Sequence, residues 1–198
     1  MTPDSILTTY DHVADGFDRR RDRTLFERKW LDRLLAHAPG RRVLDLGCGP
    51  GRPIAAYLSD RRCEVTGVDG ASAMVALFRH NLPRATAVHA DMRGLKLKAV
   101  FDVILAWNSF FHLSADDQRG MFATFAAHAA PRAVLMFTSG PSEGEAIGEV
   151  EGESVFHASL SPDEYRKLMI DAGFAPIAFV PEDPECQGHS IWLARYMG

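Results

Sequence analysis

Short apolar runs alternate with segments of helical period from residue 42 to residue 139, and this alternation limits the folds that the chain can adopt. Strands that alternate with helices predict an α/β fold, with a mostly parallel sheet covered by helices on both faces. Ligands of such folds bind at the carboxyl ends of the strands, so functional residues should follow the strands directly. The expected strands are residues 42–46, 63–68, 85–89, 101–107 and 133–139, and the expected helices are residues 53–60, 71–80 and 115–129.

The N-terminal part of the chain precedes this alternation and has helical character. Residues 24–38 carry apolar side chains on one helical face, and Thr24 and Glu27 form a predicted capping box at the start. A length of 198 residues is typical of one domain. We therefore expect a single domain over residues 1–198, with residues 1–40 as a helical cover.

The C-terminal part adds a loop, a helix and a hairpin. A glycine-rich acidic loop, SGPSEGEAIGEVEGE, follows the fifth expected strand. Ser161 and Pro162 then have the types expected at the cap and first position of a helix. Residues 174–180 and 190–196 are predicted to pair as a hairpin, which would add one antiparallel strand to the sheet.

Composition and charge narrow the class of protein. Hydrophobic residues make up 46% and charged residues 24% of the chain, as in soluble globular domains. The net charge of −4 disfavours a nucleic-acid partner. Cys48, Cys63 and Cys186 lack metal-like or CxxC spacing, which favours a reduced compartment. With no signal-like start and no apolar run of membrane-spanning length, we expect a cytoplasmic protein without membrane contacts.

The most informative motif is VLDLGCGPGRP, residues 43–53, which reads as a strand, a glycine turn and the start of a helix. Gly47, Gly49 and Gly51 let the backbone turn sharply and approach a ligand closely, although a tight strand-to-helix turn alone also explains them. Asp45 lies inside the strand. Arg52 occupies the position where a dinucleotide-binding fold has its third glycine, which disfavours that class.

Acidic residues also end the next two expected strands. Asp69 lies about 20 residues after the glycine turn, where a carboxylate accepts the hydroxyls of a ribose; an N-cap is its alternative role. Asp91 and Met92 follow the third strand, where a carboxylate and a backbone N–H suit an adenine ring, although Asp91 alone is a common turn residue. Three acids beside one glycine turn favour a nucleoside site.

Taken together, these motifs resemble those of the class I S-adenosylmethionine-dependent methyltransferases, in the small single-domain group. The resemblance covers nearly the whole chain: VLDLGCGPG matches the first motif, FDVILAWNSFFHL the fourth-strand motif and LSPDEYRKLMIDAGF the last helix. The segment YDHVADGFD is similar to an opening helix that closes over the cofactor, but Phe17 stands where the family often has a tyrosine.

The resemblance implies a Rossmann-like sheet of seven strands in the order 3-2-1-4-5-7-6, with strand 7 antiparallel. It also implies S-adenosylmethionine as cofactor, S-adenosylhomocysteine as product and methyl transfer by in-line displacement to a small-molecule acceptor. The residues implied at the cofactor are Tyr10, Asp45, Gly47, Gly49, Gly51, Asp69, Gly70, Met74, Asp91, Met92 and Trp107.

Acceptors of this family bind after the fourth strand, which implies a pocket near Trp107, Asn108, Phe111 and His112, with His157 as a weaker candidate. His112 is a weak candidate for a general base, and a structural histidine is the favoured alternative. Trp107 is equally compatible with core packing. The histidines show no ligand-like pairing, so no metal is predicted.

Charge is distributed unevenly. Residues 18–42 carry nine basic side chains, whereas residues 133–165 carry seven acidic ones and no lysine or arginine. A solvated helix and a mobile surface loop are the favoured explanation. The alternative hypothesis is that the acidic loop covers the acceptor site and disfavours anions, in which case Glu143, Glu145 and Glu149 would affect acceptor choice.

Two other functions remain open from the sequence. A non-catalytic S-adenosylmethionine-binding module or sensor would keep the glycine turn and Asp69. A nicotinamide dehydrogenase would share the fold, although Arg52 and Asp91 count against it. The acceptor, the methylated element and the oligomeric state do not follow from the sequence.

Overall fold

The computed structural model describes residues 2–198 and contains a seven-stranded sheet in the order β3-β2-β1-β4-β5-β9-β8. The order confirms the predicted topology, because β8 and β9 are the two strands of the predicted terminal hairpin and an additional hairpin precedes them in the chain. Strand β9 is antiparallel to both neighbours, and the other pairs are parallel. The strands of this sheet are β1 (Arg42–Leu46), β2 (Glu64–Asp69), β3 (Thr86–His89), β4 (Phe101–Ala106), β5 (Ala129–Ser139), β8 (Phe174–Asp183) and β9 (His189–Tyr196).

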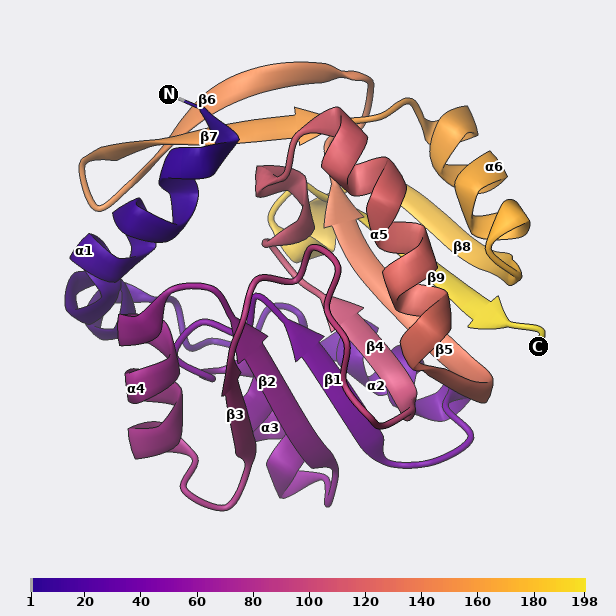
Figure 1. Cartoon of the computed structure of the whole chain (residues 1–198), viewed down its shortest axis with the longest axis horizontal. Helices are drawn as coiled ribbons and strands as arrows, with labels where there is room; N and C mark the ends of the chain where they lie inside the picture. The colour runs from indigo at the N-terminus through magenta and orange to yellow at the C-terminus, as the bar shows by residue number, and fades with distance from the viewer. Residues whose placement is uncertain (1) are drawn as a thin grey trace.

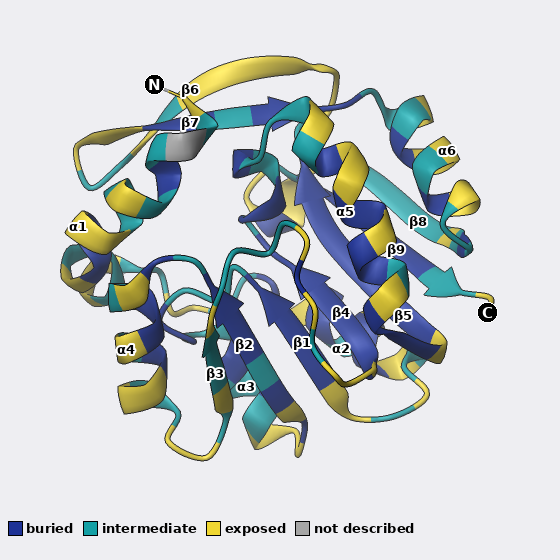
Figure 2. Cartoon of the chain, viewed as in Figure 1, coloured by how far each residue is buried: buried dark blue, intermediate teal, exposed yellow. Residues whose placement is uncertain are grey.

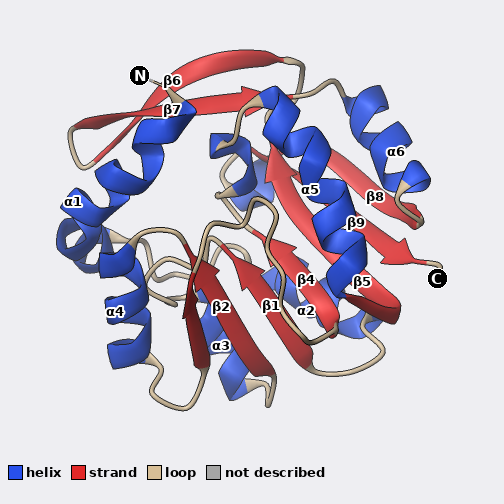
Figure 3. Ribbon diagram, viewed as in Figure 1, coloured by secondary structure: helices blue, strands red, loops and turns tan. Residues whose placement is uncertain are grey.

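Helices cover both faces of the sheet (Figure 1, Figure 3). Their bounds are α1 (Ile6–Arg20), α2 (Arg28–His37), α3 (Ile54–Asp60), α4 (Ser72–Asn81), α5 (Ala115–His128) and α6 (Pro162–Asp171), with short 3-10 turns η1 (Pro3–Ser5), η2 (Phe110–His112) and η3 (Pro184–Cys186). No helix within the described residues is long and apolar enough to cross a membrane.

The central strands are largely buried (Figure 2), and their apolar side chains on both faces form two cores, one on each side of the sheet. Alternate residues of β1 and β4 belong to different cores: Val43 and Val103 pack with α2 and α3, whereas Leu44 and Ile104 pack with α5 and α6. Because successive side chains of a strand point to opposite faces, each strand contributes to both layers.

Within the predicted helical cover, the two helices have different roles. Trp30, Leu31 and Leu34 of α2 are buried in one core of the sheet, so α2 is a structural layer. Helix α1 instead lies against α4 and β7, on the side toward which the arrowheads of β1 and β2 point (Figure 1). It therefore covers the edge where a ligand of an α/β fold would bind.

The acidic stretch predicted as a loop is largely a β-hairpin, and that part of the prediction was wrong. Strands β6 (Gly144–Val150) and β7 (Glu153–Ser159) pair antiparallel in a second sheet. Glu151 and Gly152 form the connection, with φ of +54° and +83°. Two consecutive positive φ values are typical of the turn that joins two strands tightly.

The predicted capping box at Thr24 and Glu27 was also wrong. Helix α2 begins at Arg28, and Leu25 has a φ of +57° that no helix allows. The Glu27 side chain is fully buried and accepts a hydrogen bond of 2.6 Å from Arg21 Nη2. This tertiary contact outweighs the local capping preference.

Candidate active site

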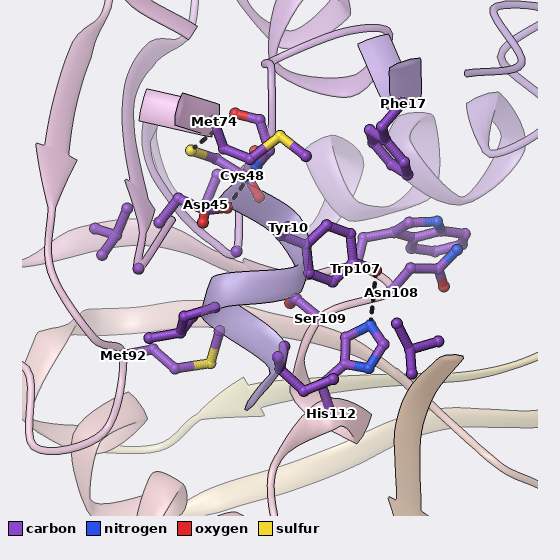
Figure 4. A pocket seen from close by; sticks show the side chains of 18 of the residues that line it. Tyr10, Phe17, Asp45, Cys48, Met74, Met92, Trp107, Asn108, Ser109 and His112 are labelled. Carbon is purple, nitrogen blue, oxygen red and sulfur yellow. Dashed lines mark hydrogen bonds between the residues drawn. The ribbon is translucent and has the colours of Figure 1, made fainter. Parts of the chain in front are cut away.

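A cavity of about 330 Å³ lies at the carboxyl ends of β1, β2 and β4, between the glycine turn, α1 and the β6–β7 hairpin (Figure 4). Its size falls within the usual range of small-molecule sites. Every site residue predicted from the sequence lies in its wall: Tyr10, Asp45, Gly47, Gly49, Gly51, Asp69, Gly70, Met74, Asp91, Met92, Trp107, Asn108, Phe111, His112 and His157.

Glycine occupies positions 47 and 49 of the turn for two different structural reasons. At Gly47, with a φ of +71°, a Cβ would lie 2.2 Å from the Ser109 Cβ, so packing alone requires glycine. At Gly49, with a φ of +52°, the nearest atom to a Cβ would be Phe17 Cε1 at 4.0 Å. The Gly49 backbone therefore faces open space in the cavity, where a ligand can approach it.

Asp69 connects the end of β2 to the glycine turn. Its Oδ2 accepts a 2.9 Å hydrogen bond from the Gly49 N–H, and its Oδ1 accepts a 2.9 Å bond from the Ala71 N–H. The side chain is buried, and burial raises its pKa despite these two bonds. The N-cap of α4 is Ala71, so the alternative role of Asp69 as the helix N-cap does not hold.

The first turn of α4 is instead capped from α1, by a residue that the sequence analysis missed. Asp11 Oδ1 accepts hydrogen bonds from the Ser72 hydroxyl at 3.1 Å and from the Ala73 N–H at 2.7 Å. A carboxylate is favoured at a helix N-terminus. The contact fixes α1 to the wall of the cavity, and its signal is absent from the sequence because the partners are 61 and 62 residues apart.

Asp45 contributes a buried carboxyl group to the cavity wall. Asp45 is 4% exposed. Its burial and the nearby charge of Asp69 raise its pKa to about 7. An aspartate in water has a pKa near 4, so this group titrates close to neutral pH only because of its surroundings. A cationic ligand group would favour its ionised form.

The other predicted acid, Asp91, is held by an arginine. Arg93 donates to Asp91 through Nε at 2.9 Å and Nη2 at 2.6 Å, and also reaches Asp117 Oδ2 at 3.3 Å. The Arg93 N–H donates to Asp91 Oδ1 at 2.8 Å, which is the turn geometry that the sequence offered as the alternative. The Asp91 carboxylate thus has a fixed orientation at the cavity wall.

The half-buried Tyr10 and the buried His112 form a hydrogen-bonded pair (Figure 4). His112 Nδ1 lies 2.8 Å from the Phe156 carbonyl oxygen, and its Nε2 lies 2.9 Å from the Tyr10 hydroxyl. Since a carbonyl only accepts, Nδ1 carries the proton and Nε2 accepts from the tyrosine. Burial lowers the pKa of His112 to about 4, so its imidazole is neutral at neutral pH.

Trp107 and Asn108 are supported by His189, for which the sequence predicted no role in the site. Trp107 stacks on the His189 ring with centroids 5.8 Å apart, and the Asn108 side-chain amide donates to His189 Nε2 at 2.8 Å. The Trp107 Nε1 is buried and has no hydrogen-bond partner within the described part of the chain. Such a donor is available to a ligand.

Two features of the predicted charge pattern need correction or refinement. Arg21, predicted as part of a solvated basic run, lines the cavity and pairs with the buried Glu27 at 2.6 Å. Among the acids of the hairpin, Glu149 lines the cavity, whereas Glu143 and Glu145 are exposed and are absent from its wall. No group of three or more metal-binding side chains occurs among the side chains that the structure describes.

Comparison with known proteins identifies methyltransferases as the relatives of this chain. Residues 43–132 match a family described as a methyltransferase domain. The chain is 34% identical over 139 residues to a malonyl-[acyl-carrier protein] O-methyltransferase of Enterobacter lignolyticus, covering 68% of this chain and 53% of the relative. It is 36% identical over 107 residues to a trans-aconitate 2-methyltransferase of Escherichia fergusonii, covering 52% and 41%. The chain thus spans about half the length of these curated relatives or less.

Solved structures share the fold at low identity. An amino pentose methyltransferase from Micromonospora echinaspora, solved with S-adenosylmethionine bound, has a TM-score of 0.72 at 22% identity, covering 93% of this chain and 95% of its own. The CcbJ methyltransferase from Streptomyces caelestis has a TM-score of 0.75 at 18% identity, covering 94% and 96%. The sheet order, the glycine turn and the family match agree, and the chain belongs to the class I S-adenosylmethionine-dependent methyltransferases.

Proposed function

We propose that this protein is an enzyme that transfers a methyl group from S-adenosylmethionine to a small-molecule acceptor. The observation that carries the proposal is the Gly49 backbone, which is open to the cavity and is tied to the buried carboxylate of Asp69. Open space alone also occurs at a surface turn such as Gly94, but at Gly49 the space is part of the cavity. The proposal includes a reduced cytoplasmic location, which the three free cysteines support, and no nucleic-acid partner.

The donor set of the cavity fits this cofactor. Its amino acid end is a zwitterion, and the cavity wall contains the buried carboxyl of Asp45 and the cations of Arg21 and Arg52. Its ribose carries two hydroxyls, for which the Asp69 carboxylate is a suitable acceptor. In this assignment Asp91 and Met92 serve the adenine, and Tyr10, Gly70, Met74 and Trp107 complete the cofactor wall.

The bound cofactor supplies an activated methyl group on a sulfonium leaving group. The protein then has to align the acceptor with the methyl carbon and exclude water. Helix α1 and the β6–β7 hairpin suit this role, since both contribute residues to the cavity wall. The two curated relatives described above are named for an acyl-carrier-bound malonyl group and for trans-aconitate, whereas one structural neighbour is named for an amino pentose.

Two measurements test the proposal on the full chain. Calorimetry with S-adenosylmethionine and with S-adenosylhomocysteine tests the cofactor, and methyl-labelled S-adenosylmethionine incubated with a metabolite pool tests the transfer. We expect binding of both compounds and label in a small molecule. Binding without any transfer would assign the protein as a cofactor-binding module, and the absence of binding would reject the proposal.

Cofactor affinity is expected to depend on pH through Asp45. In the free protein its pKa is about 7, so below pH 7 the carboxyl is protonated and must lose its proton to pair with the cofactor's ammonium group. The dissociation constant should therefore rise by up to about tenfold per unit as the pH falls below 7, and should level off above about pH 8. Calorimetry from pH 5.5 to pH 8.5 measures this dependence.

The variant Asp45→Asn separates Asp45 from other titrating groups. It removes the ionisable carboxyl at nearly the same volume, so the affinity should be weak and nearly independent of pH. A wild-type slope that persists in this variant would assign the titration to another residue.

A further inference from the structure

One part of the cavity lies between η2 and the hairpin, and we call it the acceptor chamber; it is formed by Tyr10, Phe111, His112, Glu149, Val155 and His157. We propose that the acceptor chamber takes a weakly basic amine, such as an aromatic amine, and that Tyr10 passes the amine proton to His112. The inference rests on the proposed methyl transfer and specifies its acceptor.

The chamber residues are connected by direct contacts. The His112 and His157 rings lie 4.8 Å apart between centroids, and Phe111 lies 4.7 Å from His157. Tyr10 bonds to His112 and packs in the same apolar cluster as Val155. The walls are therefore mostly aromatic, and such walls suit a flat ring.

Charge disfavours an anionic acceptor here. Two cations of the cavity wall are already paired with acids, Arg21 with the buried Glu27 and Arg93 with Asp91 and Asp117, so their charges are largely offset, and Arg52 belongs to the glycine turn. Burial lowers the pKa of both His112 and His157, so neither supplies a positive charge at neutral pH. A carboxylate in this chamber would lose its hydration beside the Glu149 carboxylate without a cationic partner.

Hydrogen-bond polarity points to a donor on the acceptor molecule. The Phe156 carbonyl fixes the proton of His112 on Nδ1, and the Tyr10 hydroxyl gives its single proton to His112 Nε2. The lone pairs that remain on the Tyr10 oxygen, and the Glu149 carboxylate at the rim, can only accept. An amine N–H satisfies both, whereas a carboxylate oxygen satisfies neither.

Methyl transfer to the amine releases one proton, which the Tyr10–His112 pair takes up. The nitrogen lone pair forms a bond to the methyl carbon while the carbon–sulfur bond breaks and its electron pair stays on the sulfur. The N-methylated cation gives its proton to the Tyr10 oxygen as the tyrosine proton moves to His112 Nε2, which becomes imidazolium. A histidine with a pKa of about 4 is a weak base, and it is adequate because the N-methylated cation of a weakly basic amine has a comparably low pKa, so the proton moves between groups of similar acidity. Water takes this proton when the products leave.

The first experiment compares matched acceptors on the protein saturated with S-adenosylhomocysteine, whose binding is verified beforehand by calorimetry. Aniline, phenol, benzylamine and benzoate, and their naphthalene counterparts, are ranked by ligand-detected NMR and by methyl transfer. We expect the aromatic amines to bind at least tenfold more tightly than the carboxylates. Equal or tighter binding of the carboxylates, or no binding of any aromatic amine, overturns the inference. Failure to bind S-adenosylhomocysteine would instead reject the proposed function.

The second experiment changes the charge at the rim of the chamber. Glu149→Lys should lower the preference for amine over carboxylate at least tenfold without changing the cofactor dissociation constant. Glu145→Lys makes the same charge change on the same strand at an exposed position outside the cavity wall, and should leave the preference within about twofold. Identical effects of the two variants would contradict a direct role for Glu149.

The third experiment separates proton transfer from packing. Tyr10→Phe removes only the hydroxyl and should lower kcat at least tenfold when the protein is saturated with cofactor. His112→Gln keeps an acceptor for the Tyr10 hydroxyl, so it should keep the acceptor KM within about threefold while kcat also falls at least tenfold. A change confined to KM in both variants would make the pair structural and would refute the relay.

Discussion

Replacing Gly49 with valine is expected to abolish S-adenosylmethionine binding while the chain remains folded. A side chain at this position has space, because the nearest atom to its Cβ is 4.0 Å away, but it projects into the cavity beside Phe17. The φ of +52° adds a strain of about 1–2 kcal/mol for an L-residue, which a domain of this size tolerates. We expect a melting transition that is lowered but still cooperative, and no heat of binding in calorimetry.

Gly94→Val is the matched control for the backbone strain. Gly94 has a φ of +63°, no atom within 4 Å of a Cβ, and no place in the cavity wall. This variant should lose similar stability and bind the cofactor normally. If Gly49→Val still binds, the glycine turn serves only to reverse the chain.

Replacing Asp69 with alanine is expected to weaken S-adenosylmethionine binding by about 1.5–3 kcal/mol, which is roughly a 10- to 150-fold rise in Kd. The lost carboxylate has two roles: it is the proposed acceptor for the ribose hydroxyls, and it holds the Gly49 N–H at 2.9 Å. Both losses act on the cofactor, so the affinity should fall even where the fold persists. Calorimetry at pH 8 measures the change.

Asp102→Ala is the matched control, because it also removes an aspartate from a strand of the sheet. Asp102 lies at the start of β4, at the opposite end of the sheet, where it accepts hydrogen bonds from Arg42 at 2.9 to 3.1 Å. Its removal should lower the melting temperature and leave cofactor affinity unchanged. An unchanged affinity in Asp69→Ala as well would mean that the ribose binds elsewhere.

The core of the site was predictable because its signals are local. The strand, the glycine turn and the helix start lie within residues 43–60, and the acids Asp69 and Asp91 each follow a strand. In a parallel sheet the carboxyl ends of neighbouring strands meet at one edge, so residues identified one strand at a time converge on one cavity. The order of the strands in the sheet was predictable only from the family resemblance, since apolar runs alone do not specify which strands pair.

The features that were misassigned from the sequence depend on packing that short-range sequence patterns do not specify. Glu27 fits a capping box in sequence, but a buried pair with Arg21 occupies it. The composition around Glu151 and Gly152 predicted a mobile loop, but these residues form the turn of a hairpin. The buried side of that hairpin packs on α1 in an apolar cluster that includes Ile6 and Phe156. Local preferences amount to about 1 kcal/mol, so a buried tertiary contact overrides them.

By itself the sequence determined the α/β class, the position of the glycine turn and the acids at the strand ends, because hydrophobic period and turn chemistry act over a few residues. The tertiary structure decided how the cavity is closed and what its acceptor side offers. Tyr10 and His112 are 102 residues apart, and His112 and the Phe156 carbonyl are 44 apart. Their bonds fix the tautomer of the histidine and the polarity of the chamber, and only the packing of α1 and the hairpin over the sheet brings these atoms within hydrogen-bond distance.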